Sequence, residues 1–298
     1  MIKKFIVETK FNGVRLDDFV TIKIGLTKNQ VQKLIAHYQV LVNNALVKKS
    51  NLLKSQDIVT INLSTLIEKS NFLSPINLNL EIIYEDQYLA VINKPANLIV
   101  HPSVSFRGVT LINGLLYQIK DFIKMPLSER MGIIHRLDKD TTGLILVGKT
   151  IEVVEKMQQL LQNKGITRIY YALIEGFLDQ KGTIILPIKR DHRNPLKMSV
   201  ASQGKIAITH FNTLKKINNY SLLEITLETG RTHQIRVHLS YLKHPVIGDN
   251  LYNSKKYSVS SQLLHAKKLY FNHPWTGKRL QFDIPLPQKF KEFIKFLE

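Results

Sequence analysis

The stretch GIIHRLDKDTTGLILVGKT, residues 132–150, constrains the chain more than any other. Two short apolar runs rich in β-branched residues, Ile133–Ile134 and Leu144–Val147, predict buried strands on either side of a charged loop. Because alternate residues of an extended backbone point the same way, Arg136 and Asp138 are expected to share one side, while the residue between them points into the core. A carboxylate beside a guanidinium stays ionised, so this loop is a candidate active site.

The same stretch contains a second motif. Residues 143–150, GLILVGKT, match the GxxxxGK[ST] pattern of a nucleotide-binding loop letter for letter. Such a loop must follow a strand, and its backbone must be free to curl around a phosphate. Here the four intervening residues, Leu144–Val147, are themselves a predicted strand. A nucleotide hydrolase is therefore disfavoured, and ATP binding by the purified protein would revive it.

The charge balance points to a polyanionic partner. Among 298 residues, 42 are Lys or Arg and 23 are Asp or Glu, which gives a formal net charge of +19. A surplus of this size favours nucleic acid as the partner over a merely lysine-rich surface. The chain has no cysteine, which excludes disulfides, thiolate metal sites and cysteine nucleophiles.

Nothing in the sequence indicates a membrane or a partner chain. No apolar run approaches the ~20 residues that span a bilayer, and the N-terminus lacks the apolar core of a signal peptide. We therefore expect a cytoplasmic protein that does not bind a membrane. No coiled-coil seam is visible, and we expect a monomer without an obligate protein partner.

Changes in periodicity along the chain predict two domains. Residues 1–63 form a compact unit that begins with a strand over residues 1–12, and Thr27 opens a helix with Val31, Leu34 and Ile35 on one face. Further short strands, separated by a turn at Asn43-Asn44, are expected at Val40–Val42, Leu46–Val47 and Ile58–Ile61. Residues 64–78 have no sustained period and include Pro75, so they are predicted to be a linker. Residues 79–298 form the second, larger domain.

Two segments of the second domain bear on function. Arg168–Ile174 reads as a strand, with Tyr170 among the residues of one face. Farther on, Gly230 ends a strand and Thr232 is expected to cap a helix. Arg231 lies at that junction, where a cation opposes the helix dipole, so it needs another partner such as a carboxylate.

With these pieces in place, the chain resembles the RluA/RluD family of RNA pseudouridine synthases over nearly its full length, and most closely the RluD branch, which acts on large-subunit ribosomal RNA. The N-terminal unit resembles an S4 domain. In the RIYYA segment, Arg168 stands where the family commonly has Lys. Four segments carry the resemblance: GIIHRLDKDTTG (132–143), RIYYA (168–172), GRTHQIRVHL (230–239) and LHAKKLYFNHPWTG (264–277).

The resemblance implies an α+β fold: a catalytic domain with a mixed, largely antiparallel sheet flanked by helices, preceded by a small S4-like α/β RNA-binding domain. It implies an enzyme that isomerises uridine to pseudouridine in RNA, and 23S ribosomal RNA is the expected substrate. Neither a cofactor nor a metal is expected, because the isomerisation involves no net oxidation or group transfer. Naked RNA and a pre-ribosomal particle both remain open as the substrate.

The resemblance also assigns roles to individual residues. It makes Asp138 the catalytic aspartate, acting either as nucleophile at C1′ or as base at C2′ of the ribose. Arg231 would pair with Asp138, although a phosphate contact is the alternative for this arginine, and Tyr170 would stack on the uracil. Arg136 resembles the residue that enters the RNA helix as the target uridine flips out. Further RNA contacts are expected from His135, Lys28 and Lys33.

A rival of another class is a catalytically silent RNA-binding protein on the same scaffold. Such a protein would be expected to lack Asp138, Tyr170 or Arg231. All three residues are present in the chain.

Overall fold

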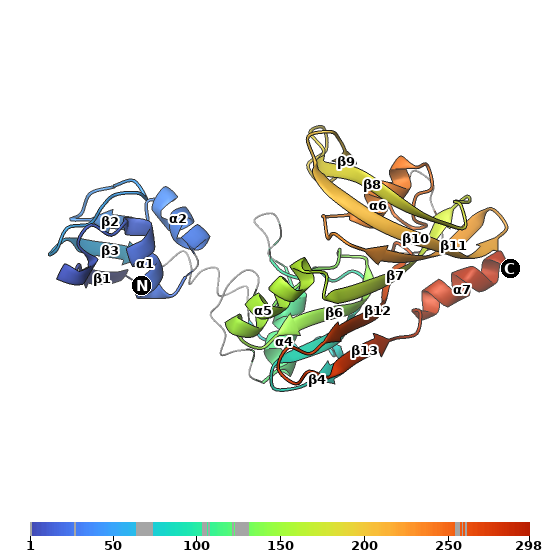
Figure 1. The fold of residues 1–298 in the computed structure, drawn as a ribbon, viewed down its shortest axis with the longest axis horizontal. Helices are drawn as coiled ribbons and strands as arrows, with labels where there is room; N and C mark the ends of the chain where they lie inside the picture. The colour runs from blue at the N-terminus through green and yellow to red at the C-terminus, as the bar shows by residue number, and fades with distance from the viewer. Residues whose placement is uncertain are drawn as a thin grey trace. The chain divides into compact units, whose positions relative to one another are not determined.

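The structure is a computed structural model that describes residues 2–26, 28–63, 74–102, 106, 108–120, 122, 131–253, 257, 259 and 261–298 (Figure 1). The chain divides into two compact units, Met1–Leu73 and Ser74–Glu298. Most of the linker expected at residues 64–78 lies outside the described residues. Its last part belongs to the second unit, because Asn113 Nδ2 donates to the Ser74 carbonyl at 2.9 Å and the Ile76 N–H donates to the Asn113 carbonyl at 3.0 Å.

The N-terminal unit has one small antiparallel sheet with the strand order β1–β3–β2. Its strands are β1 (Ile2–Ile6), β2 (Val40–Val42) and β3 (Ile58–Asn62). Its helical elements are the 3-10 turn η1 (Thr9–Phe11) and the helices α1 (Leu16–Ile24) and α2 (Lys28–Ala36).

Most of the sequence pattern in this unit is confirmed. Val31, Leu34 and Ile35 of α2 are buried in the core of the unit. Asn43 and Asn44 have positive φ angles of 50° and 64°, as a tight turn requires. The strand predicted at Leu46–Val47 is wrong, because the turn closes through a single bridge between Val42 and Ala45 and the chain then leaves the sheet. The predicted cap, Thr27, lies outside the described residues.

The second unit is built on a ten-stranded sheet with the order β4–β5–β6–β12–β7–β11–β10–β8–β9, and β13 pairs with β12. All pairings are antiparallel except the parallel pair β6–β12, so the predicted mixed, largely antiparallel sheet is confirmed. The strands are β4 (Glu81–Glu85), β5 (Leu89–Lys94), β6 (Thr142–Gly148), β7 (Ile166–Glu175), β8 (Lys181–Arg190), β9 (Met198–Val200), β10 (Lys205–Ile217), β11 (Tyr220–Leu227), β12 (Leu264–Asn272) and β13 (Arg279–Asp283).

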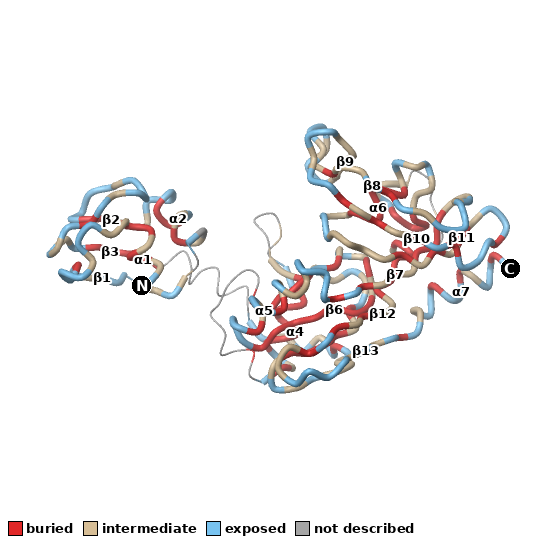
Figure 2. Tube along the Cα trace, in the orientation of Figure 1, coloured by how far each residue is buried: buried red, intermediate tan, exposed pale blue. Residues whose placement is uncertain are grey.

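Helices accompany this sheet, and its strand β6 is buried, as the red tube in Figure 2 shows. They are α4 (Leu111–Gln118), α5 (Ile151–Gln162), α6 (Gln234–Tyr241) and α7 (Gln288–Leu297). Helix α5 lies beside β6 and begins at Thr150, whose hydroxyl accepts the Val153 N–H at 3.2 Å. Within the described part of the chain, no helix is long and apolar enough to cross a membrane.

Residues 132–150 contain one strand rather than the two that were predicted. Leu144–Val147 lie inside β6, so the GxxxxGK match is an extended, buried strand and not a phosphate loop. Ile133–Ile134 are buried as expected, but they form only an isolated bridge with Val147 and no strand. At the start of β6, Gly143 has a φ of +108°, and a Cβ there would lie 2.3 Å from the Ala266 carbonyl oxygen. The close approach of β12 therefore requires glycine at this position.

Candidate functional site

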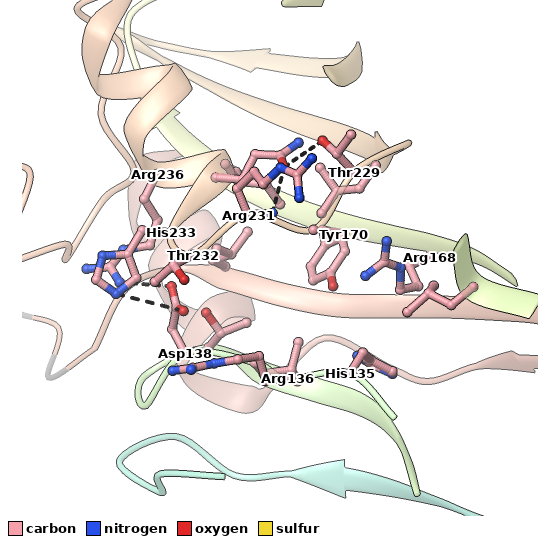
Figure 3. Close-up of a pocket in the computed structure, with 18 of the residues that line it drawn as sticks. His135, Arg136, Asp138, Arg168, Tyr170, Thr229, Arg231, Thr232, His233 and Arg236 are labelled. Atoms are coloured by element: carbon pink, nitrogen blue, oxygen red, sulfur yellow. Dashed lines mark hydrogen bonds and ion pairs between the residues drawn. The ribbon is translucent and has the colours of Figure 1, made fainter. Parts of the chain in front are cut away.

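A cavity of about 460 Å³ lies in the second unit, where the loop before β6, strand β7 and the turn into α6 meet (Figure 3). The loop contributes Arg136 and Asp138, β7 contributes Arg168 and Tyr170, and the turn contributes Arg231 with its neighbours. Segments more than 90 residues apart along the sequence thus supply one site.

Asp138 is held by an arginine that we did not single out from the sequence. Arg236 Nη1 donates to Asp138 Oδ2 at 2.9 Å, and its Nε and Nη2 donate to the two oxygens of Asp249 at 2.7 and 2.9 Å. The guanidinium lies 5.0 Å from the centre of the Tyr252 ring, a cation–π distance. The side chain of Arg236 is only 9% exposed and that of Asp138 15%. Two carboxylates and a ring therefore fix this guanidinium, which in turn orients Asp138.

The surroundings of Asp138 keep it ionised. Burial raises the pKa of its carboxyl group, but His233, Arg236 and Arg136 outweigh that effect and hold the pKa below its usual value. His233 Nε2 lies 3.9 Å from Asp138 Oδ1, too far for a hydrogen bond. Burial also lowers the pKa of His233 despite the nearby Asp138, so near pH 7 its imidazole is neutral and Arg236 and Arg136 supply the positive charge beside Asp138. Oδ1 of Asp138 thus has no hydrogen bond from the described residues, and the residue lines the cavity.

The predicted pair between Arg231 and Asp138 is wrong. Arg231 is exposed, and its Nε donates to the Ile206 carbonyl at 3.1 Å. The helix begins one residue later than expected, with His233 rather than Thr232 at the N-cap, in the left-handed conformation (φ 56°, ψ 19°). This turn directs Arg231 toward β10, and Arg236, in the first turn of the helix, reaches Asp138 instead.

A buried glutamine fixes this turn. The Arg231 N–H and the Thr229 hydroxyl both donate to Gln234 Oε1, at 2.9 and 2.8 Å. Gln234 Nε2 donates to the Ile208 carbonyl of β10 at 3.0 Å. The first turn of α6 is thereby tied to the sheet, which holds Arg236 in place.

Strand β7 presents two buried polar side chains to the cavity. Tyr170 is 5% exposed and Arg168 is 8% exposed, and they are two residues apart on the same face of the strand. The alternation predicted for Tyr170 is confirmed. Burial raises the pKa of the Tyr170 hydroxyl, so the phenol is neutral.

Arg136 and His135 differ in exposure, although we expected both to contact RNA. Arg136 is exposed at the rim of the cavity. His135 is 7% exposed, and its Nε2 accepts the Leu146 N–H at 3.0 Å, a contact that holds the loop against β6. Burial, with a contribution from Arg168, lowers the pKa of His135 to about 3, so its ring is neutral.

A buried lysine fixes the loop from its other side. Lys94, fully buried at the end of β5, donates to the carbonyls of Pro95, Leu98 and Lys139 at 2.7, 2.9 and 2.9 Å. Lys139 follows Asp138 directly, so this ammonium group anchors the backbone of the loop. Burial lowers the pKa of Lys94 to about 7, although the nearby Asp140 and Asp138 act against it.

The two remaining predicted residues, Lys28 and Lys33, lie on α2 of the N-terminal unit and are exposed. Lys28 Nζ is paired with Asp18 Oδ1 at 2.6 Å. No structural feature of this unit assigns them a ligand, and their contact with RNA stays a prediction.

The sequence did hold a signal for Arg236. It lies in the run IRVHL, where a helix with apolar neighbours on both sides must bury it, and a buried arginine needs a carboxylate. Asp249 and Lys94 had no comparable local signal, because their partners are distant in the sequence. Among the described residues, no group of three or more His, Asp or Glu side chains could hold a metal ion.

Comparison with known proteins identifies the family of the chain. Residues 88–241 match the family model described as RNA pseudouridylate synthase, and residues 14–59 match the S4 domain model. The chain is 38% identical to the uncharacterized RNA pseudouridine synthase YlyB of Bacillus subtilis, over 95% of this chain and 94% of that protein. It is 40% identical to the ribosomal large subunit pseudouridine synthase D of Pseudomonas aeruginosa, over 74% of this chain and 72% of that protein.

A solved structure shares the fold. Human RNA pseudouridylate synthase domain containing 4 superposes with a TM-score of 0.57 at 24% identity, over 73% of this chain and 92% of that one. The family model covers more than half of the chain, and the bacterial relatives match most of it. The chain therefore belongs to the RNA pseudouridine synthase family of enzymes and carries an S4 domain at its N-terminus.

Proposed function

We propose that this enzyme converts uridine to pseudouridine in large-subunit ribosomal RNA, with Asp138 as its catalytic carboxylate. The main support is the geometry of Asp138: Arg236 holds its Oδ2, Oδ1 has no hydrogen bond from the described residues, and Asp138 lines the same cavity as Tyr170. The substrate class is supported by relatives named ribosomal large subunit pseudouridine synthase D, such as the one from Pseudomonas aeruginosa.

The reaction suits a single carboxylate. The N1–C1′ bond breaks, a C5–C1′ bond forms, the C5 hydrogen leaves as a proton and N1 gains one. Glycoside hydrolysis normally uses two carboxylates, because one must protonate a poor leaving group. Uracil leaves as a delocalised anion and must stay in the site, so one group suffices. Asp138 acts either as the nucleophile at C1′ or as the base at C2′.

Other residues of the cavity would position the nucleotide. The target uridine must leave the RNA stack, because C1′ and C5 are inaccessible in a duplex. Arg136, exposed at the rim, would occupy the space that the base leaves. Tyr170 would stack on the uracil inside the cavity. Arg231 is exposed and does not contact Asp138, which favours the phosphate contact for this arginine.

Tritium release tests the reaction and the carboxylate together. RNA labelled at uridine C5 must lose the label when the C5–C1′ bond forms. We expect release by the wild-type enzyme from 23S ribosomal RNA, and a loss of at least roughly 10³-fold in Asp138→Asn, with RNA affinity nearly unchanged. Comparable activity of the variant would refute the assignment of Asp138. Release from transfer RNA alone would refute the proposed substrate.

The S4 domain would supply general affinity for RNA. Removing residues 1–63 leaves the second unit with its own core, so it should fold and retain chemistry on short RNA. We expect weaker RNA binding and a smaller dependence of log Kd on log salt, because basic side chains such as Lys33 and Lys28 are lost. An unchanged salt slope would exclude this role.

A further inference from the structure

Arg168 is a buried side chain that has no counter-ion among the described residues. It is 8% exposed and lines the cavity, and no hydrogen bond or ion pair joins its side chain to another described residue. Its Nε is fully buried and finds no hydrogen-bond acceptor in the part of the chain that the structure describes. A buried charge without a partner is strongly unfavourable, so proteins rarely keep one unless a ligand supplies the partner.

The carboxylates that line the same cavity are already engaged. Asp138 is paired with Arg236, and Glu228 is paired with Lys164 and, at 2.7 Å, with His210 Nε2. The charge of Arg168 acts on the ring of His135, but that ring is neutral and cannot balance it. Within the described part of the cavity, the positive charge of Arg168 is therefore uncompensated.

The position of Arg168 indicates what it would bind. Arg168 and Tyr170 project from the same face of β7, about 7 Å apart along the strand. In Figure 3, Tyr170 lies between Asp138 and Arg168. Arg168, Tyr170 and Asp138 all line the same cavity. A uracil stacked on Tyr170 with N1 toward Asp138 would extend its carbonyl edge toward Arg168.

We propose that Arg168 donates hydrogen bonds to a carbonyl oxygen of the target uracil and stabilises the negative charge that the base acquires as the N1–C1′ bond breaks. This rests on the proposed function. The electron pair of that bond moves onto the base and is shared between O2 and O4. A guanidinium already in place, with no other anion to release, stabilises this charge without reorganisation.

Two substitutions separate charge from shape. Arg168→Gln removes the charge, whereas Arg168→Lys keeps it. We expect Arg168→Gln to lower the single-turnover rate of tritium release by about 10²- to 10³-fold while RNA affinity changes less than about 2-fold. We expect Arg168→Lys to stay within about 10-fold of wild type, since it retains the cation.

Thermal unfolding of the RNA-free protein provides an independent readout. Arg168→Gln should unfold at the wild-type temperature or above it, because it removes an unpaired buried charge. A lower melting temperature for Arg168→Gln, with equal loss of activity in Arg168→Lys, would mean that Arg168 is structural.

Loss of RNA affinity in Arg168→Gln, with a salt slope reduced by about one, would mean that Arg168 binds a phosphate. Either of these results overturns the proposal. Neither result would contradict the proposed function, which is tested by tritium release with the wild-type enzyme and by its loss in Asp138→Asn.

Discussion

Each end of the cavity has a buried arginine, and the two arginines differ in their partners. At one end, Arg236 is bound by two carboxylates and lies against the Tyr252 ring. At the other end, Arg168 is equally buried and has no partner among the described residues. The first guanidinium completes its contacts within the protein. The second has no such contacts among the described residues, and our proposal is that the uracil supplies them.

A third buried cation shows an intermediate arrangement. Lys94 is bound by three backbone carbonyls, which are dipoles rather than charges. The three cations thus range from full charge compensation, through neutral acceptors, to none. The first two orient Asp138 and its loop, so they serve stability and position. This difference is what the proposal for Arg168 rests on.

The same substitution at both arginines should therefore give different results. Arg236→Met leaves Asp138 and Asp249 buried without their cation, and we expect it to lower the free energy of unfolding by about 3–5 kcal/mol. Turnover should fall by about 10²-fold or more, because Asp138 is no longer held. Arg168→Met should lower turnover without lowering stability. Urea unfolding of the RNA-free variants measures this, and equal destabilisation by both would contradict the contrast.

A smaller change at the first end keeps its arginine. Asp249→Asn retains one oxygen for the N–H groups of Leu251 and Tyr252 but removes the charge beside Arg236 Nε. We expect a loss of about 1–3 kcal/mol in the free energy of unfolding. Turnover should fall by about 10-fold, because Arg236 still holds Asp138. A loss as large as that of Arg236→Met would mean that Asp249, and not Arg236, orients the site.

Much of this arrangement follows from the sequence, and the limits have a physical cause. Alternation placed Tyr170 in the cavity, and the apolar run Leu144–Val147 excluded a phosphate loop, because both patterns are local. The partner of Asp138 was misassigned, because the left-handed conformation of His233 turns Arg231 away. A single residue's backbone conformation leaves no periodic signal, and neither does a long-range contact such as that of Lys94 with Lys139.

The low pKa of Lys94 predicts that the free energy of unfolding depends on pH. Its pKa is about 7 in the folded protein, against 10.5 for an ordinary lysine. Between these values the unfolded chain binds a proton that the folded protein does not, so the free energy of unfolding rises with pH, by at most about 1.4 kcal/mol per pH unit. Below pH 7 both states are protonated and the slope vanishes. Urea unfolding of wild type and Lys94→Met from pH 6 to 9 measures how the free energy of unfolding changes with pH. If the two proteins showed the same change per pH unit, the low pKa of Lys94 would be contradicted.

The smallest expected effect comes from giving Arg168 the counter-ion that it lacks. Gly230 lines the cavity with an ordinary φ, and a Cβ there would lie 3.3 Å from Arg168 Nη1. Gly230→Asp would therefore place a carboxylate beside the guanidinium. We expect the free energy of unfolding to rise by about 1 kcal/mol, which corresponds to about 2–4 °C in melting temperature. We also expect turnover to fall by about 10-fold, because the carboxylate competes with the uracil for Arg168.

Gly230→Asn is the matched control, since it has the same shape and the same restriction of the unfolded chain but no charge. It should show neither the competition nor the part of the stabilisation that comes from the ion pair. If the two variants unfold at the same temperature and turn over at the same rate, Arg168 does not respond to a carboxylate beside it. The two ends of the cavity would then differ in geometry and not in charge compensation.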